Sequence, residues 1–453
     1  MDFKDLSVNK WGAWAFYLAV FCLPFQTQIL LYQAEWGRGF VNPYGSIWIT
    51  SSSFLCGISL LAYAWGHFKR KTKLQWGYPG ISLSVFAVLT LHIISWLISP
   101  YKDPALHAFL LAQAFSLFAF YFLGIQENIK VKFILGAFVL SMSLQAFLAI
   151  FQGIFQTSLG LHVLGEPHIL KQTAQLAKMD IFGGWIRSYG TFPHPNILGG
   201  FLVISLLATQ LLKSYFPHQK KWLSALQMLG LFFTFSRSAS LALLLSVVIL
   251  ASWTYSNWKN RPWLPGILGF VFFIQLSALA IIRGFTLFKD PAVLERLEGL
   301  KIAFEMLKTY PFGVGAGHYT FFMDEVSKTP LAPWEYQPVH NVFILAFAEL
   351  GIAGGSIVLA GTIWGLITIF QKRKKWLSKE SVFKKRIILA MGLSLFVIGF
   401  FDHYLFSLEA GKKLVLLIAV LASHFMNKQM VSIKKVSETP KILPDLAEKP
   451  LHP

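Results

Sequence analysis

The sequence carries little charge for its length. Of its 453 residues, 13% are charged and 55% are hydrophobic, with a mean hydropathy of +0.56. An ordinary soluble domain has about 25% charged residues. Because long apolar runs recur from one end to the other, the sequence predicts an all-α, polytopic membrane protein rather than a soluble domain.

Cysteine is almost absent, and several common motifs are missing. Cys22 and Cys56 both lie within apolar segments, which excludes a disulfide framework and gives no indication of redox compartment. The chain has no glycine-rich phosphate loop, CxxC pair or internal repeat. No small-residue cleavage site follows the first apolar run, so we expect a retained helix rather than a signal peptide.

Acidic residues are also scarce. The chain has 21 Asp and Glu against 40 Lys and Arg, a formal net charge of +19. Nucleic-acid binding would be one explanation of this excess, but the basic residues cluster between apolar runs in alternate loops. Of the 40, 26 fall on one side of the membrane if every span crosses, which is the positive-inside pattern. We therefore predict cytoplasmic termini, a lipid bilayer as surroundings and no nucleic-acid partner.

About twelve segments are long enough to cross a bilayer about 30 Å thick. They lie near residues 12–33, 45–66, 80–98, 105–124, 132–154, 195–213, 221–236, 238–254, 263–283, 340–370, 386–402 and 411–427. Two long loops, 155–194 and 284–339, fall on the outer side, and loops of this length are usually functional or partly structured. We expect N-terminal membrane helices over 1–154, a membrane region with both loops over 155–427, and a disordered cytoplasmic tail over 428–453.

The second outer loop contains a predicted amphipathic helix. Its apolar residues follow spacings of three and four: Val293, Leu297, Leu300, Phe304 and Leu307. Glu295, Glu298 and Glu305 point away from this stripe. Arg296 lines up with Leu300 and Ala303, so we expect it to face whatever the helix covers.

Two arginine-bearing motifs stand at the outer ends of apolar segments. The first is "RSYGTFPHPN". Its Arg187 carries a planar guanidinium that can donate two hydrogen bonds to a phosphate, and its Asn196 can cap a helix. The structural alternative is that the motif only shapes the start of a helix through its prolines. In the second, "TFSRSASL", Arg237 lies between two short apolar halves, where an unpaired guanidinium costs several kcal/mol. Snorkelling to the interface is its structural alternative.

The stretch "HNVFILAFAELGIAGG" begins another span. His340 lies at a helix N-terminus, which disfavours the imidazolium and leaves the ring able to accept a proton. Asn341 can cap the helix or orient the histidine. Glu349 lies nine residues deeper, and an intramembrane carboxylate is a functional candidate; bonding to polar groups of neighbouring helices is the structural alternative.

Three weaker features complete the outer side. Asp402 and His403 in "FDHYLFSLEAGK" could orient His340, bind an acceptor or cap helices. The turn "GVGAGHY" lacks the strand and the Lys-Ser/Thr of a P-loop, so we expect a flexible turn. A metal site could be drawn from His318, Asp324 and Glu325, but their spacing is nonspecific, and we predict no metal.

These residues together indicate one kind of chemistry. Several arginines and one neutral histidine at one membrane face suit a substrate with a diphosphate leaving group and a hydroxyl nucleophile. The arginines would neutralise the leaving group, and the histidine would take the proton of the hydroxyl.

In this order, the motifs resemble the O-antigen ligase/polymerase superfamily of integral membrane glycosyltransferases. The resemblance covers about 185–425 and rests on "RSYGTFPHPN", "TFSRSASL", "RLEGLKIAFEMLKTYPFGVGAGHY" and "HNVFILAFAELGIAGG". It implies a metal-independent, inverting enzyme without a cofactor that takes an undecaprenyl diphosphate-linked glycan as donor, at the outer face of the bacterial cytoplasmic membrane. It further implies that Arg237 and Arg296 hold the diphosphate and that His340 is catalytic, with a less secure match at Arg187.

The resemblance leaves the acceptor open. Ligases, chain polymerases and protein O-oligosaccharyltransferases share these motifs and transfer to lipid A core, a growing glycan or a protein hydroxyl. The absence of a large soluble extension favours a ligase. A secondary transporter or flippase is the alternative from another class, although no repeated halves are visible.

Overall fold

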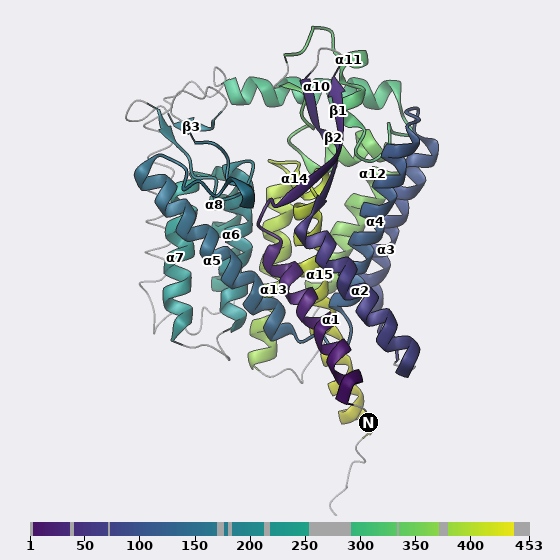
Figure 1. Ribbon diagram of the computed structural model, residues 1–453, viewed down its shortest axis with the longest axis vertical. Coiled ribbons are helices and arrows are strands. Elements are labelled where there is room, and N and C mark those ends of the chain that lie inside the picture. The colour runs from purple at the N-terminus through teal and green to yellow at the C-terminus, as the bar shows by residue number, and fades with distance from the viewer. Residues whose placement is uncertain are drawn as a thin grey trace, which may run out of the picture.

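The computed structural model describes residues 3–36, 40–70, 73–169, 176–179, 184–212, 218–252, 291–332, 335–370 and 379–438. Most of these residues are helical, and the long helices stand side by side as a bundle (Figure 1). The helices are α1 Phe3–Cys22, α2 Ser51–Arg70, α3 Pro79–Ile98, α4 Pro104–Gly124, α5 Val131–Phe155, α6 Pro195–Leu211, α7 Gln219–Thr234, α8 Arg237–Ser252, α10 Pro291–Thr309, α11 Met323–Val326, α12 Val342–Phe370, α13 Lys379–Gly399, α14 Tyr404–Ser407 and α15 Glu409–Glu438.

Membrane-spanning helices are present among the described residues. By length and composition, α3, α4, α5 and α12 can each cross a membrane, and α6 and the first part of α8 are shorter apolar helices. The chain is therefore a multi-pass membrane protein. The expected span 263–283 lies outside the described residues, and the total of twelve spans and their orientation stay predictions.

The expected first and second spans were partly wrong, because a β-hairpin separates them. The helix α1 ends at Cys22, and strands β1 (Gln28–Trp36) and β2 (Phe40–Thr50) pair antiparallel. Pro24 lacks the backbone donor needed to continue a helix, and the strands that follow are rich in aromatic and β-branched residues. The hairpin stands at the same end of the bundle as α10 (Figure 1). The short pair β3 (Lys178–Met179) and β4 (Trp185–Ile186) adds two further strands. The described residues are otherwise largely helical, which is consistent with the predicted all-α membrane protein.

The amphipathic helix of the second outer loop is confirmed as α10, which lies across one end of the bundle (Figure 1). The face that it buries differs from the predicted stripe. Ile302, Ala303 and Met306 are buried, whereas Leu297 and Phe304 are 44% and 53% exposed. A face centred on a small residue such as Ala303 lets two backbones approach more closely than one lined with large side chains. Arg296 shares the face of Ala303, as predicted.

The glycine-rich turn after α10 is packed rather than flexible, contrary to expectation. Its backbone N–H groups at Val314 and Gly315 donate to the carbonyls of Ala348 and Glu349, and Ile352 donates to Pro311. The helix α12 is interrupted there, because Gly351 has φ 73° and ψ −180°. The break frees helix carbonyls, and the turn supplies the donors that non-helical backbone needs at membrane depth.

The last helix is longer than predicted. The last span was expected to end at residue 427, with a disordered tail after it, whereas α15 continues to Glu438. The final residues, 439–453, lie outside the described part of the chain.

Candidate active site

A cavity of about 1260 Å³ brings together most of the residues that the sequence singled out. Its walls come from both outer loops, the β-hairpin and several helix ends. Seven of the nine predicted site residues line it: Arg187, Asn196, Arg237, Arg296, His340, Asp402 and His403. Residues separated by up to 216 positions thus line one cavity, whose volume is above that of ordinary small-molecule pockets.

His340 and Asp402 form the polar centre of the cavity. The Nδ1 atom of His340 lies 3.8 Å from Oδ1 of Asp402, and the two side chains are 20% and 5% exposed. This separation is slightly longer than a hydrogen bond, as is common where no substrate is bound. Nδ1 is buried without a hydrogen-bond partner among the described residues, so we expect Nε2 to be the ring nitrogen that a substrate in the cavity would meet.

Two more histidines surround the carboxylate. The backbone N–H of His403 donates to Asp402 Oδ1 at 2.8 Å, and the His403 ring lies 5.1 Å from the ring of His340. Burial opposes the charge on Asp402, but its contact with His340 holds the pKa of the carboxyl below the usual range. The carboxylate is therefore ionised at neutral pH.

The neighbouring histidines are held neutral. Burial lowers the pKa of His403 to about 3. Burial and then the charge of Arg187 lower the pKa of His194 to about 3. Of the three imidazoles around Asp402, His340 is thus the one placed to exchange a proton with a molecule in the cavity.

Arg187 and Asn196 connect the first outer loop to this centre. Arg187 donates from Nε to the Thr234 carbonyl at 2.8 Å and from Nη2 to Asn196 Oδ1 at 2.6 Å. The amide of Asn196 in turn donates to Asp402 Oδ2 at 3.4 Å. These contacts give both residues a part in holding the carboxylate, besides any contact with substrate.

Arg237 and Arg296 reach the cavity from different helices. Phe235 takes a left-handed conformation (φ 46°) and closes α7, so that α8 begins at Arg237. This break between two short apolar helices was predicted, and it explains how a guanidinium is tolerated there: the side chain lies at a helix end on the cavity wall. Arg296 projects from the inward face of α10, and both side chains are half-buried.

Asn341 and Glu349 do not line the cavity. Asn341 caps α12, because its Oδ1 accepts from the backbone N–H groups of Phe343 and Ile344 at 3.0 Å each. Glu349 is 3% exposed, and its carboxylate accepts from the N–H of Gly317 at 2.8 Å. The structure places both where they position helix α12 and the packed turn.

One group of side chains in the described part of the chain could hold a metal ion. His340, Asp402 and His403 offer ligand atoms that all lie within 4.8 Å of one another. His318, Asp324 and Glu325 are not brought together in this way; Asp324 and Glu325 bond to Tyr336 and Tyr310 instead. A divalent cation would thus compete for the atoms that place His340 beside its carboxylate.

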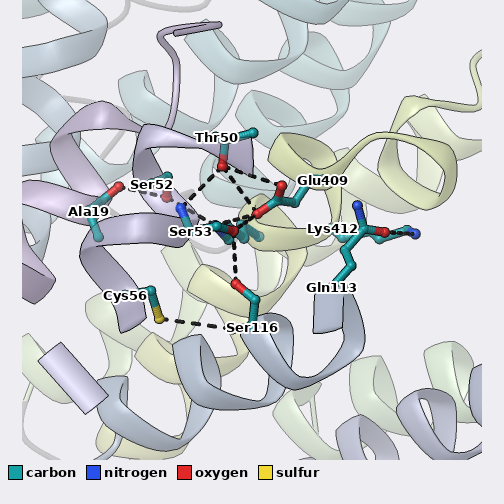
Figure 2. A network of polar contacts seen from close by, with 10 residues as sticks. Ala19, Thr50, Ser52, Ser53, Cys56, Gln113, Ser116, Glu409 and Lys412 are labelled. Carbon is teal, nitrogen blue, oxygen red and sulfur yellow. Dashed lines mark hydrogen bonds and ion pairs between the residues drawn. The ribbon is translucent and has the colours of Figure 1, made fainter. Parts of the chain in front are cut away.

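The sequence prediction missed a second polar region of the cavity, at the start of α15. Glu409 accepts from Lys413 Nζ at 2.6 Å, and also from Thr50 and Ser53 (Figure 2). Lys412, one residue earlier, contacts Gln113 of α4 (Figure 2). The signal was available, because three charged residues open an apolar segment, and the rule that pointed to Glu349 applies to them equally.

The pair Glu409–Lys413 leads to a stability prediction. Lys413 is fully buried, so replacing it with methionine leaves the Glu409 carboxylate desolvated without its counter-charge. Breaking a buried pair in this way costs about 3–5 kcal/mol, and we expect Lys413→Met to lower Tm in detergent markedly. The matched control is the double variant Glu409→Met/Lys413→Met, which removes both charges and should regain much of the loss. A Lys413→Met protein as stable as wild type would contradict this role.

Comparison with known proteins gives a family match. Residues 222–359 match the family described as O-Antigen ligase. No curated protein matches the chain. The matched segment runs from α7 into α12 and contains Arg237, Arg296 and His340, whereas Arg187, Asp402 and Lys412 lie outside it.

Proposed function

By this match the chain belongs to the O-antigen ligase superfamily, and on that premise we propose that it transfers a glycan from an undecaprenyl-diphosphate carrier to an acceptor hydroxyl. The acceptor is lipid A core or a similar glycolipid, and the reaction takes place at the outer face of the bacterial cytoplasmic membrane. His340 is the general base, and Arg237 and Arg296 bind the diphosphate.

The proposed reaction is a single displacement. Nε2 of His340 takes the proton of the acceptor hydroxyl while its oxygen attacks the anomeric carbon of the donor glycan. The bond between that carbon and the diphosphate oxygen breaks on the opposite face, so the configuration inverts. The leaving diphosphate keeps the bonding electrons, and the two guanidinium groups stabilise its charge.

Asp402 has a positioning role in this scheme. An ionised, buried carboxylate beside Nδ1 keeps the other ring nitrogen free to accept the proton and stabilises the imidazolium that forms. Arg187 and Asn196 hold that carboxylate in place. We infer that Asn341 and Glu349 act one step further away, through the helix that carries His340.

One observation carries this proposal: the cavity joins a histidine–aspartate pair to arginines from three separate parts of the chain. A base for a hydroxyl and cations for a diphosphate are the two requirements of the reaction. A transporter would need neither the pair nor its placement at one end of the bundle.

The test is transfer by the purified full-length protein in nanodiscs. The donor is an undecaprenyl-diphosphate glycan, and the acceptor is a glycolipid extract from a strain that lacks this gene. We expect product in the presence of excess EDTA at the same rate as without it, because the cations in the scheme are arginines. Loss of transfer with EDTA and recovery with a divalent ion would assign His340, Asp402 and His403 to a metal instead.

The deletion strain separates a ligase from its relatives. Lipid-linked polymer that is never attached to the cell-surface acceptor indicates a ligase, whereas acceptors capped by single repeat units indicate a polymerase. Loss of glycan from proteins alone indicates a protein O-oligosaccharyltransferase.

A further inference from the structure

Two consecutive lysines near the start of α15 have opposite surroundings. The ammonium of Lys413 lies 2.6 Å from Glu409 Oε1 and 2.8 Å from Ser53 Oγ. Its charge is neutralised within the protein. Lys412 contacts the amide oxygen of Gln113 at 3.3 Å, and among the described residues no carboxylate lies within ion-pair distance of it.

The carboxylates nearest to Lys412 are already engaged. Glu349 and Glu409 are the acidic groups whose fields reach the Lys412 ammonium. Glu349 accepts from backbone N–H groups of the packed turn, and Glu409 is bound by Lys413, Thr50 and Ser53 (Figure 2). Both carboxylates thus have other hydrogen-bond partners, and Lys412 lines the cavity together with Gln113.

The walls of the cavity are strongly basic. Among the described residues, six basic and three acidic side chains line it, the basic ones being Lys178, Arg187, Arg237, Arg296, Lys412 and Lys413 and the acidic ones Glu295, Asp402 and Glu409. A cavity with this excess favours anionic ligands. One diphosphate need not contact every one of these basic side chains.

Lys412 belongs to a different wall from Arg237. Arg237 begins α8, which stands with α5, α6 and α7 on one side of the bundle, whereas Gln113 belongs to α4, which stands beside α3 on the other (Figure 1). The helix α15, which carries Lys412, packs against α4 and α3.

We propose that Lys412 and Gln113 form a second anion subsite, which binds a phosphate or carboxylate group on the acceptor. This inference rests on the proposed function and names the class of acceptor: one with an acidic group close to the hydroxyl that reacts. The position of Lys412 in the first turn of a long helix adds the favourable field of the helix N-terminus. Gln113 holds the ammonium at the cavity wall and offers its amide NH₂ group as a further donor.

The test compares Lys412→Met with wild type in the nanodisc assay, using the glycolipid extract as acceptor. We expect the acceptor KM to rise at least about 10-fold, as for loss of a charged hydrogen bond, while the donor KM changes less than about 2-fold. Lys412→Arg should keep the acceptor KM within about 3-fold, because it retains the charge. Lys301→Met, on the exposed face of α10, is the null control, and an unchanged Tm for Lys412→Met shows that it folds.

Three acceptor preparations identify the anion. They are the untreated extract, the extract after phosphatase, and the extract after chemical reduction of its carboxyl groups. We expect wild type to lose about 10-fold in kcat/KM on one treated extract, and Lys412→Met to show no further loss on that same extract, because the two changes remove one interaction. Loss with phosphatase assigns a phosphate, and loss with reduction assigns a carboxylate.

The outcomes distinguish failure of the acceptor subsite from failure of the proposed function. If wild type transfers glycan but neither treatment affects it, or if Lys412→Met raises both KM values alike, the acceptor subsite is wrong and the proposed function stands. If wild type transfers nothing to the untreated extract, the proposed function fails and the subsite falls with it.

Discussion

A His340→Ala variant will lose glycan transfer by about 10²–10⁴-fold, the usual contribution of a positioned general base. Three described histidines line the cavity, His340, His403 and His194, and burial lowers the pKa of His403 and of His194 to about 3. The loss should appear in kcat with little change in the donor KM, because the proton transfer belongs to the transition state and not to donor binding.

The measurement is initial rate of product formation at saturating donor and acceptor, on protein matched for amount and Tm. His218→Ala is the matched control: this histidine is exposed immediately before α7 and should leave the rate unchanged. Full transfer by His340→Ala at normal expression would remove the histidine from the mechanism.

The Asp402→Asn variant should show a smaller loss of rate than His340→Ala. The amide keeps the shape of the side chain but removes the charge that faces Nδ1. The rate should fall less than in His340→Ala, and the combined variant should be no slower than His340→Ala alone, because Asp402 acts through the histidine.

An Arg296→Ala variant will lose about 10²–10³-fold in kcat, the usual effect of removing one donor from a charge-stabilising site. Arg296 projects from the inward face of α10 into the cavity, so its loss removes positive charge from the site of the leaving diphosphate. Arg296→Lys should recover only part of the rate, because a lysine is a point charge and lacks the planar fork that suits phosphate.

Lys301→Met again provides the control, since Lys301 lies on the same helix with a side chain 72% exposed. The Arg237→Ala variant should give a loss of the same order, and the double variant should lose less than the product of the two single effects if both guanidinium groups bind one diphosphate. An Arg296→Ala enzyme with wild-type kcat would show that Arg296 of α10 does not stabilise the leaving diphosphate.

The sequence predicted those elements whose pattern lies within one run of neighbouring residues. The apolar segments of α3, α4, α5 and α6 were located to within two residues, because a run of apolar residues with polar ends fixes both length and position. The break before Arg237 and the helix α10 were visible for the same reason. The hairpin β1–β2 was missed, because its apolar residues continue those of α1 and only Pro24 marks the change.

The tertiary structure was needed for features that depend on packing between segments distant in the sequence. The buried face of α10 depends on what lies beneath it, and the sequence alone favoured the largest apolar residues over Ala303. The turn 311–319 reads as a flexible glycine-rich loop until its donors are seen to bond to carbonyls of Ala348 and Glu349. For Glu349 the sequence offered a structural alternative, but it could not name the carboxylate's partners on the turn, Gly317 and Tyr319.

The sequence by itself determined that this chain is a multi-pass membrane protein with arginines and a histidine at span ends, since apolar length and charge placement are properties of neighbouring residues. It also supplied the motifs that match the family. Only the tertiary structure decided that Asp402 lies beside His340, that Asn196 reaches that carboxylate, and that Lys412 contacts Gln113 whereas Lys413 bonds to Ser53. These contacts join residues from 62 to 360 positions apart, and pairing at such separations depends on how the helices pack.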